Sequence, residues 1–195
     1  MAEQADLESY RNAGYIVSAK DIVEGGVYCM EFEVPLIEAR MESVGLAIQD
    51  VAVDISAAMD QSSETWHDNA PADAAFAHLN KLDQDKHRLT IAQRRLVQLP
   101  YPTPDMGIVT VGSLITCEMK DDEFGLLIVG NAPVHHPHDY EGNDIASLVA
   151  PIPRALLGLE VGDETNFTVG DRVQSVAVRA IDQTVIHTFA QAQCI

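Results

Sequence analysis

The sequence predicts an α+β fold, in which an antiparallel coiled-coil hairpin of two long helices precedes a small β-rich domain. Three observations lead to this prediction. Apolar side chains recur at alternating steps of three and four residues through residues 37–58, and helix-type sequence resumes after a polar break until about residue 98. Beyond the closely spaced Pro100, Pro102 and Pro104, the pattern changes to that of strands.

The first helix is expected to begin at Pro35, a residue suited to a helix first turn. Seven apolar residues then occupy the a and d positions of successive heptads: Ile37, Met41, Val44, Ile48, Val51, Ile55 and Ala58. Polar residues such as Glu42 and Asp50 lie between them. The pattern favours one arm of a coiled coil, and the alternative is an amphipathic helix packed on a globular core.

The second helix has a less regular seam, formed by Ala75, Leu79, Leu82, Leu89 and Leu96 and interrupted at Lys86 and Gln93. Two such arms would each reach about 35 to 40 Å, with a tip at residues 61–71. We therefore expect a hairpin over residues 35–99 and a proline-rich linker over residues 100–106. Residues 1–34 form an N-terminal extension to which the sequence assigns no role, although residues 27–30 are of strand type.

The β-rich domain is expected over residues 107–182. Its candidate strands are residues 108–117, 124–130, 145–149, 164–169 and 173–181. The pair Gly170-Asp171 is able to turn a hairpin between the last two strands, and a short helical turn is expected at residues 153–157. Residues 183–195 form a tail in which residues 184–189 suggest one more strand.

The composition restricts the function. A formal charge of -18 repels a phosphate backbone, so direct binding to duplex DNA is disfavoured. The excess of acidic residues either serves solubility or adaptation to a salty cytoplasm, or it steers a partner toward the protein by long-range electrostatic attraction. The N-terminus has no signal-peptide pattern and the chain has no membrane-spanning run, so we expect a cytoplasmic protein. Cys29, Cys117 and Cys194 are expected to be reduced, packed thiols.

A family resemblance enters at residues 150–164, which read Ala-Pro-Ile-Pro-Arg-Ala-Leu-Leu-Gly-Leu-Glu-Val-Gly-Asp-Glu. This run resembles the C-terminal signature of the GreA/GreB family of bacterial transcription factors, Ser-Pro-Leu-Gly-Arg-Ala-Leu-Leu-Gly-Lys-Lys-Val-Gly-Asp-Glu. Val111-Gly112-Ser113 resembles the start of the same domain, and the upstream hairpin corresponds to the family's other half. The resemblance spans about residues 35–181.

The resemblance implies an FKBP-like β domain without isomerase function, which docks on the rim of the secondary channel of bacterial RNA polymerase. The hairpin then reaches toward the polymerase active site, where the family's tip acids help to hold a catalytic Mg²⁺ during cleavage of backtracked RNA. Such a protein is no enzyme of its own and binds no cofactor alone, because the Mg²⁺ is shared with the polymerase. Mg²⁺ prefers a few carboxylate oxygens and keeps several waters, which suits this role.

The family's tip, Asp-Leu-Ser-Glu-Asn-Ala, aligns best with residues 65–70 through Asn69 and Ala70. Asp68 then replaces the family's glutamate, and Thr65 stands at the position of its aspartate, with Glu64 next to it. The resemblance therefore implies Asp68 and Glu64 as candidate ligands of the shared Mg²⁺. Because one acid is shortened and the other shifted, the sequence leaves open whether the protein stimulates transcript cleavage or occupies the channel without cleavage.

Three tip residues have alternative readings. Trp66 either packs against the polymerase or closes the end of the coiled coil over Phe76. His67 is either a hydrogen-bonding or proton-transfer group or a simply exposed side chain. Asp68 is either a metal ligand or the N-cap of the second helix.

On the β domain, the family's Ser-Pro pair, which contacts the polymerase, corresponds to Ala150-Pro151. Ala150 lacks the hydroxyl, so docking would rest more on shape and apolar contact. Arg154 either faces the polymerase or forms a structural ion pair.

The run His135-His136-Pro137-His138-Asp139 is read either as an exposed insertion or as a metal site. No nucleophile elbow, phosphate-binding loop or HExxH pattern indicates an independent hydrolase. An alternative of another class is a helical-hairpin interaction module that never meets RNA polymerase.

Overall fold

The computed structural model describes residue 22 and residues 26–61, 70–103 and 106–193. The chain divides into two compact units, one formed by Pro35–Arg94 and the other by the segments on either side. No helix among the described residues is long and apolar enough to cross a bilayer.

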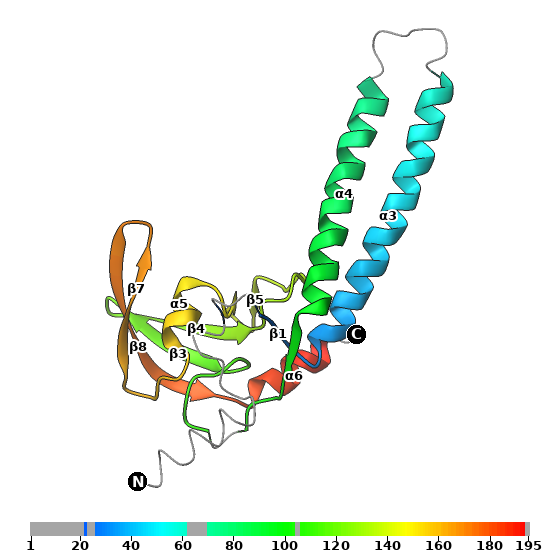
Figure 1. Cartoon of the computed structure of the whole chain (residues 1–195). Coiled ribbons are helices and arrows are strands. Elements are labelled where there is room, and N and C mark those ends of the chain that lie inside the picture. The colour runs from blue at the N-terminus through cyan, green and yellow to red at the C-terminus, as the bar shows by residue number, and fades with distance from the viewer. Residues whose placement is uncertain (1–21, 23–25, 62–69, 104–105, 194–195) are drawn as a thin grey trace. The chain divides into compact units, whose positions relative to one another are not determined.

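The first unit is a pair of long helices. Helix α3 spans Glu33–Gln61 and helix α4 spans Ala70–Arg94, and the two run in opposite directions (Figure 1). At 1.5 Å per residue their lengths are about 43 Å and about 37 Å. All seven a and d positions predicted for α3 are buried or half-buried, whereas Glu42 and Asp50 are exposed. The expected seam of α3 therefore coincides with the side chains that avoid water.

The predicted seam of α4 was wrong at two positions of its second half, whereas Leu89 is buried as expected. Lys86 and Gln93, which we expected on the seam, are exposed. Asp85 is half-buried and Ala92 is buried in their place. A straight helix turns once in 3.6 residues, so a strict seven-residue repeat gradually moves away from the face that is in contact. A shift by one residue, from 86 to 85 and from 93 to 92, returns the side chains to that face.

Helix α4 also ends earlier than expected. Residues 96–98 were predicted to continue the helix, but strand β2 occupies Leu96–Leu99. It pairs in parallel with strand β1, Val27–Met30, from Val27 opposite Leu96 to Met30 opposite Leu99. The prediction of strand structure at residues 27–30 is thus confirmed, and this distant pairing overrides the local helical preference of the sequence after Arg94.

The second unit contains a six-stranded sheet. Its strands are β3 (Leu114–Met119), β4 (Asp122–Val129), β5 (Asp139–Tyr140), β6 (Asn143–Ser147), β7 (Glu164–Val169) and β8 (Arg172–Asp182). They lie in the order β5-β6-β4-β3-β8-β7. All neighbours are antiparallel except β4 and β6, which are parallel.

Most predicted strands are confirmed, with shifted bounds. The pair Gly170-Asp171 turns the β7–β8 hairpin, and Gly170 has a positive φ of 59°. The strand expected at residues 108–117 begins only at Leu114. Ile108 instead forms an isolated bridge with Glu160, and Gly112 has a φ of 92°, which takes the backbone out of the extended region before Leu114.

Two helices accompany the sheet. Helix α5, Pro151–Leu156, confirms the predicted helical turn. Helix α6, Val185–Gln193, corrects the strand predicted at residues 184–189. Its buried residues are Ile186, Phe189 and Ala190, and steps of three and four residues from Ile186 place them on one face of a helix. Just before the helix, the amide and the hydroxyl of Thr184 each donate a hydrogen bond to the Asp182 carboxylate.

Candidate functional site

The six candidate residues of the predicted tip lie outside the described residues. Glu64, Thr65, Trp66, His67, Asp68 and Asn69 all fall between Gln61, where α3 ends, and Ala70, where α4 begins. Phe76, the proposed packing partner of Trp66, is on α4 and is 42% exposed. The roles of the tip residues remain predictions from the sequence.

The first half of the Gre-like motif forms α5 and the turn after it. Ala150 is the N-cap residue with an extended backbone, and its carbonyl accepts a hydrogen bond from the Arg154 amide at 3.0 Å. Leu156 is fully buried. Gly158 has a φ of 85°, and its amide donates to the carbonyl of Val109 at 2.8 Å. These residues anchor the helix to the domain.

The second half of the motif forms a tight turn into β7. The Asp163 carboxylate accepts a hydrogen bond from the Glu160 amide at 2.9 Å. Gly162 has a φ of 98°, and its amide donates to the carbonyl of Val178 on β8. The glycines and the aspartate of the motif therefore have structural reasons for their positions.

The exposed members of this segment are the candidates for contact with a partner. Pro151 and Arg154 are exposed and Ala150 is half-buried. Arg154 forms no ion pair with any described residue, which leaves its guanidinium available. The apolar side chains of Val149 and Val161, before and after α5, are 46% and 56% exposed. The segment thus offers apolar contact with one accessible positive charge.

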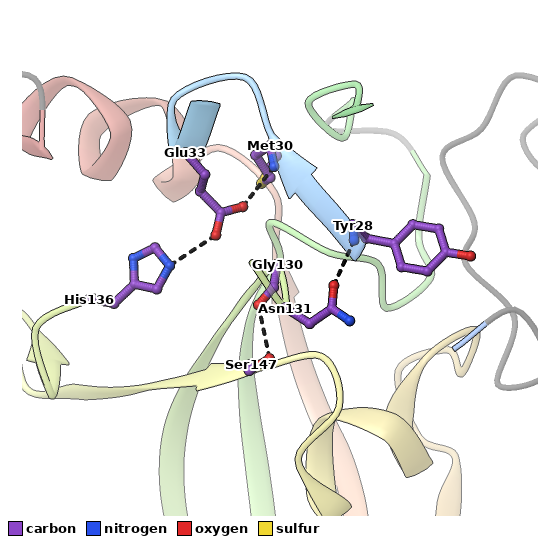
Figure 2. Close-up of polar contacts among 7 residues, drawn as sticks. All are labelled: Tyr28, Met30, Glu33, Gly130, Asn131, His136 and Ser147. Carbon is purple, nitrogen blue, oxygen red and sulfur yellow. Dashed lines mark hydrogen bonds and ion pairs between the residues drawn. The ribbon is translucent and has the colours of Figure 1, made fainter. Parts of the chain in front are cut away.

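A buried polar pair, which the sequence did not predict, joins the first residue of α3 to the histidine-containing loop (Figure 2). The Oε1 atom of Glu33 lies 2.9 Å from Nε2 of His136, and Oε2 accepts a hydrogen bond from the Met30 amide at 2.7 Å. The Glu33 side chain is 0% exposed. A buried carboxylate without such partners would be strongly unfavourable, so both contacts stabilise this arrangement.

His136 is enclosed by aromatic rings, which corrects the reading of its loop as wholly exposed. Its ring centroid lies 6.2 Å from that of Phe32 and 6.4 Å from that of Phe189. Its Nδ1 atom is buried and has no hydrogen-bond partner among the described residues. His135 and His138 are exposed, so the neighbouring histidines lie in different environments.

Strand β1 is held on its other edge by the segment that follows β4. The Asn131 side chain accepts a hydrogen bond from the Tyr28 amide at 2.6 Å and donates one to the carbonyl of Gly26 at 3.1 Å. The Asn131 amide donates to the carbonyl of Tyr28 at 2.9 Å. Gly130 lies so close to β1 that a Cβ atom there would overlap the carbonyl oxygen of Tyr28. In the sequence, Gly130 is the one feature of this segment that could have indicated the close approach of another backbone.

The described residues include no group of three or more His, Cys, Asp or Glu side chains placed to hold a metal ion. Cys29 and Cys117 are free and buried, as predicted, and Cys194 lies outside the described residues. Burial, with a smaller effect of Glu33, raises the pKa of the Cys29 thiol to about 12, and burial raises the pKa of Cys117 to about 11. Neither thiol is an ionised nucleophile at neutral pH.

Comparisons with known proteins complete the description. No family model and no curated protein sequence matches the chain. Solved structures do: GreA factor homolog 1 (Gfh1) of Thermus thermophilus has 18% sequence identity over 80% of this chain and 98% of that chain, with a TM-score of 0.38. Gfh1 of Thermus aquaticus has 19% identity over 80% and 98%, with a TM-score of 0.38. The transcription elongation factor GreA/GreB from Nitrosomonas europaea has 19% identity over 80% and 98%, with a TM-score of 0.32. The names of these structures are those of the family that residues 150–164 resemble.

Proposed function

We propose that this chain is a Gre-like transcription factor that binds bacterial RNA polymerase through its secondary channel and modulates elongation or transcript cleavage. The observation that supports it is the combination, in one chain, of the Gre-like motif at residues 150–164 with a long antiparallel helical hairpin. The motif supplies a docking segment on a β domain. The hairpin supplies an extension of about 40 Å that ends in a short acidic connection.

In this proposal the docking segment consists of Ala150, Pro151 and Arg154. Pro151 supplies exposed apolar surface next to Val149, and Arg154 supplies the only charge of α5. On a chain with a net charge of -18, an exposed arginine that pairs with no acid of the described residues favours contact with an acidic surface. Replacing Arg154 should therefore weaken binding, and the loss should be greater at low salt, where charge contacts are strongest.

The tip is proposed to act inside the polymerase. The carboxylates of Asp68 and Glu64 are chemically suited to Mg²⁺, which binds hard oxygen ligands, whereas Thr65 offers only a neutral hydroxyl. A shared Mg²⁺ would supply electrostatic stabilisation and an activated water for RNA cleavage by the polymerase. The protein's own part is to bring one or two carboxylates to that ion. Because only Asp68 stands at an acidic position of the family's pattern, and it is shorter than the family's glutamate, occupation of the channel without cleavage is equally supported.

Binding is the first test. The full-length protein is mixed with bacterial core RNA polymerase at low salt, and the affinity of the wild type is compared with that of Arg154→Glu. Arg172→Glu is the matched control, because Arg172 is an exposed arginine elsewhere on the same sheet unit. We expect the wild type and Arg172→Glu to bind similarly and Arg154→Glu to bind at least ten times more weakly. Absence of wild-type binding at low salt removes the transcription hypothesis and leaves the helical-hairpin interaction module.

The second test separates the two modes. RNA cleavage is measured on a stalled, backtracked elongation complex with Mg²⁺, with wild type, Asp68→Ala and Glu64→Ala. Stimulation that is lost in Asp68→Ala supports metal-assisted cleavage through the tip. Binding without stimulation supports an inhibitory or modulatory factor.

A further inference from the structure

Helix α3 has a second apolar stripe that faces solvent. Its members follow one another at steps of seven or four residues: Ala39, Leu46, Val53 and Ala57. All four are exposed, and Leu46 and Val53 are 55% and 67% exposed. Because seven residues make almost two full turns of a helix, these side chains form a line along one face, here called the outer stripe.

The outer stripe is distinct from the seam of the hairpin. Leu46 comes two residues after the buried Val44, and Val53 comes two residues after the buried Val51. Two residues correspond to about 200° around a helix axis, so each exposed side chain is on the opposite side from a buried one. An α3 that packed only through its seam would have polar residues on this opposite face.

Folding does not account for the outer stripe. Side chains that remain half or more exposed gain little from the hydrophobic effect. Val53 is in addition β-branched, and on a solvated helix face such a residue is less favourable than alanine, glutamate or lysine. Single exposed apolar residues are ordinary on protein surfaces, but aligned ones are typical of contact surfaces.

The surroundings of the stripe define what could cover it. Glu42 and Asp50 stand four residues before and after Leu46, one on each side of the line. Over residues 35–61 there are five acidic side chains and one basic side chain, Arg40. A favourable occupant therefore has an apolar stripe of the same heptad spacing with positive charges on both of its flanks.

A second copy of this chain does not meet these conditions. Pairing two α3 outer stripes would bring the acidic flanks together, which is unfavourable. Helix α4 has more basic residues, but contact of α3 with α4 of another copy joins two different surfaces. The exposed large apolar side chains of α4, Phe76 and Ile91, are 15 residues apart, so they do not match the spacing of the outer stripe.

We propose that the outer stripe of α3 is a docking surface for a basic amphipathic helix of a partner protein. Leu46 and Val53 bind in the gaps between apolar side chains of that helix, while Glu42 and Asp50 pair with its lysines or arginines. The surface lies on the shaft of the hairpin and uses neither the tip nor α5.

The test uses the full-length protein and three synthetic helical peptides. The first has leucines at heptad spacing and lysines on both flanks, the second replaces the lysines with glutamates, and the third keeps the lysines and replaces the leucines with serines. Binding is measured by fluorescence anisotropy for the wild type and for Leu46→Gln/Val53→Gln. Ile91→Gln, which changes a 38% exposed residue of α4, is the matched control.

We expect saturable binding of the first peptide alone, a loss of at least tenfold in the Leu46→Gln/Val53→Gln variant and no change in Ile91→Gln. Circular dichroism verifies that the variants keep their helices. If the serine peptide binds as tightly as the leucine peptide, or the double variant binds as tightly as the wild type, net charge alone explains the binding and the proposal is overturned. Absence of binding by the first peptide would also overturn the proposal. A wild-type oligomer in sedimentation that dissociates in the double variant would overturn it as well, because the occupant would then be a second copy.

Discussion

The carboxylate of Glu33, which is fully buried, lies 2.9 Å from the imidazole of His136, 103 residues later in the chain. The same carboxylate accepts a hydrogen bond from the Met30 amide, three residues earlier at the end of β1. One side chain thus holds both the end of β1 and the loop between β4 and β5.

Removing the histidine should destabilise the protein. In His136→Leu, Glu33 keeps its backbone donor but loses its side-chain partner in a buried site, and the expected decrease in the free energy of unfolding is about 3 kcal/mol. Urea unfolding, followed by circular dichroism, measures it. His135→Leu is the control, since His135 is exposed and should change stability by about 0.5 kcal/mol or less.

The double variant Glu33→Gln/His136→Leu distinguishes a lost pair from a badly packed ring. If the isolated charge causes the loss, removing it as well should recover part of the stability. A double variant that is less stable than His136→Leu alone would show that Glu33 contributes mainly through the Met30 amide.

Two glycines should respond to alanine in opposite directions. Gly45 lies within α3 with nothing within 4 Å of an added Cβ atom, so Gly45→Ala should stabilise the protein by about 1 kcal/mol. At Gly130 the Cβ atom would overlap the backbone of Tyr28 and the Glu33 carboxylate, so Gly130→Ala should destabilise it by about 2 kcal/mol or more. Thermal unfolding of both variants checks the signs, and a neutral Gly130→Ala would mean that β1 can move away from β4.

The elements that the sequence predicts well are those whose signals are local. Strands β7 and β8 are joined by Gly170-Asp171, and both the alternation of their side chains and the turn residues are read within twenty residues. Helix α3 has a regular apolar repeat and a proline near its start. The Gre-like motif forms a short helix and two glycine turns, each of which has a recognisable sequence signal.

Several other features were missed because they depend on contacts between distant residues. Leu96–Leu99 has no strand signal of its own and becomes extended because β1 lies beside it. The pair Glu33 and His136 cannot be found from spacing, because neither residue indicates the other. Residues 184–189 suggest a strand, yet burial of Ile186, Phe189 and Ala190 favours a helix.

The start of α6 should weaken in acid. Hydrogen bonds from the Thr184 hydroxyl and amide lower the pKa of Asp182 below its ordinary value of 3.8. A carboxyl whose pKa is lower in the folded state stabilises the protein above that ordinary value and loses this contribution as the pH falls through the folded-state pKa. Asp182→Ala should thus cost about 1 kcal/mol at neutral pH and less at a pH of about 2. Urea unfolding at both pH values tests this, and a cost that does not depend on pH would contradict a role for the carboxylate charge.

The buried thiols should make the protein sensitive to alkali. The pKa of Cys29 rises from 9.0 to about 12 in the folded state, so between these values the unfolded chain loses a proton that the folded chain keeps. A raised folded-state pKa means that the full contribution is present below pH 9 and is lost as the pH rises toward 12, by up to about 1.4 kcal/mol per pH unit. In Cys29→Ala, the free energy of unfolding should therefore fall less steeply with pH than in the wild type, with a difference of about 2 kcal/mol by a pH of about 10.5. Comparing how steeply the free energy of unfolding changes with pH removes the effect of the smaller alanine side chain, because that effect is the same at every pH. Equal slopes would mean that water reaches the Cys29 thiol, and rapid alkylation of the folded protein at pH 8 would confirm that alternative.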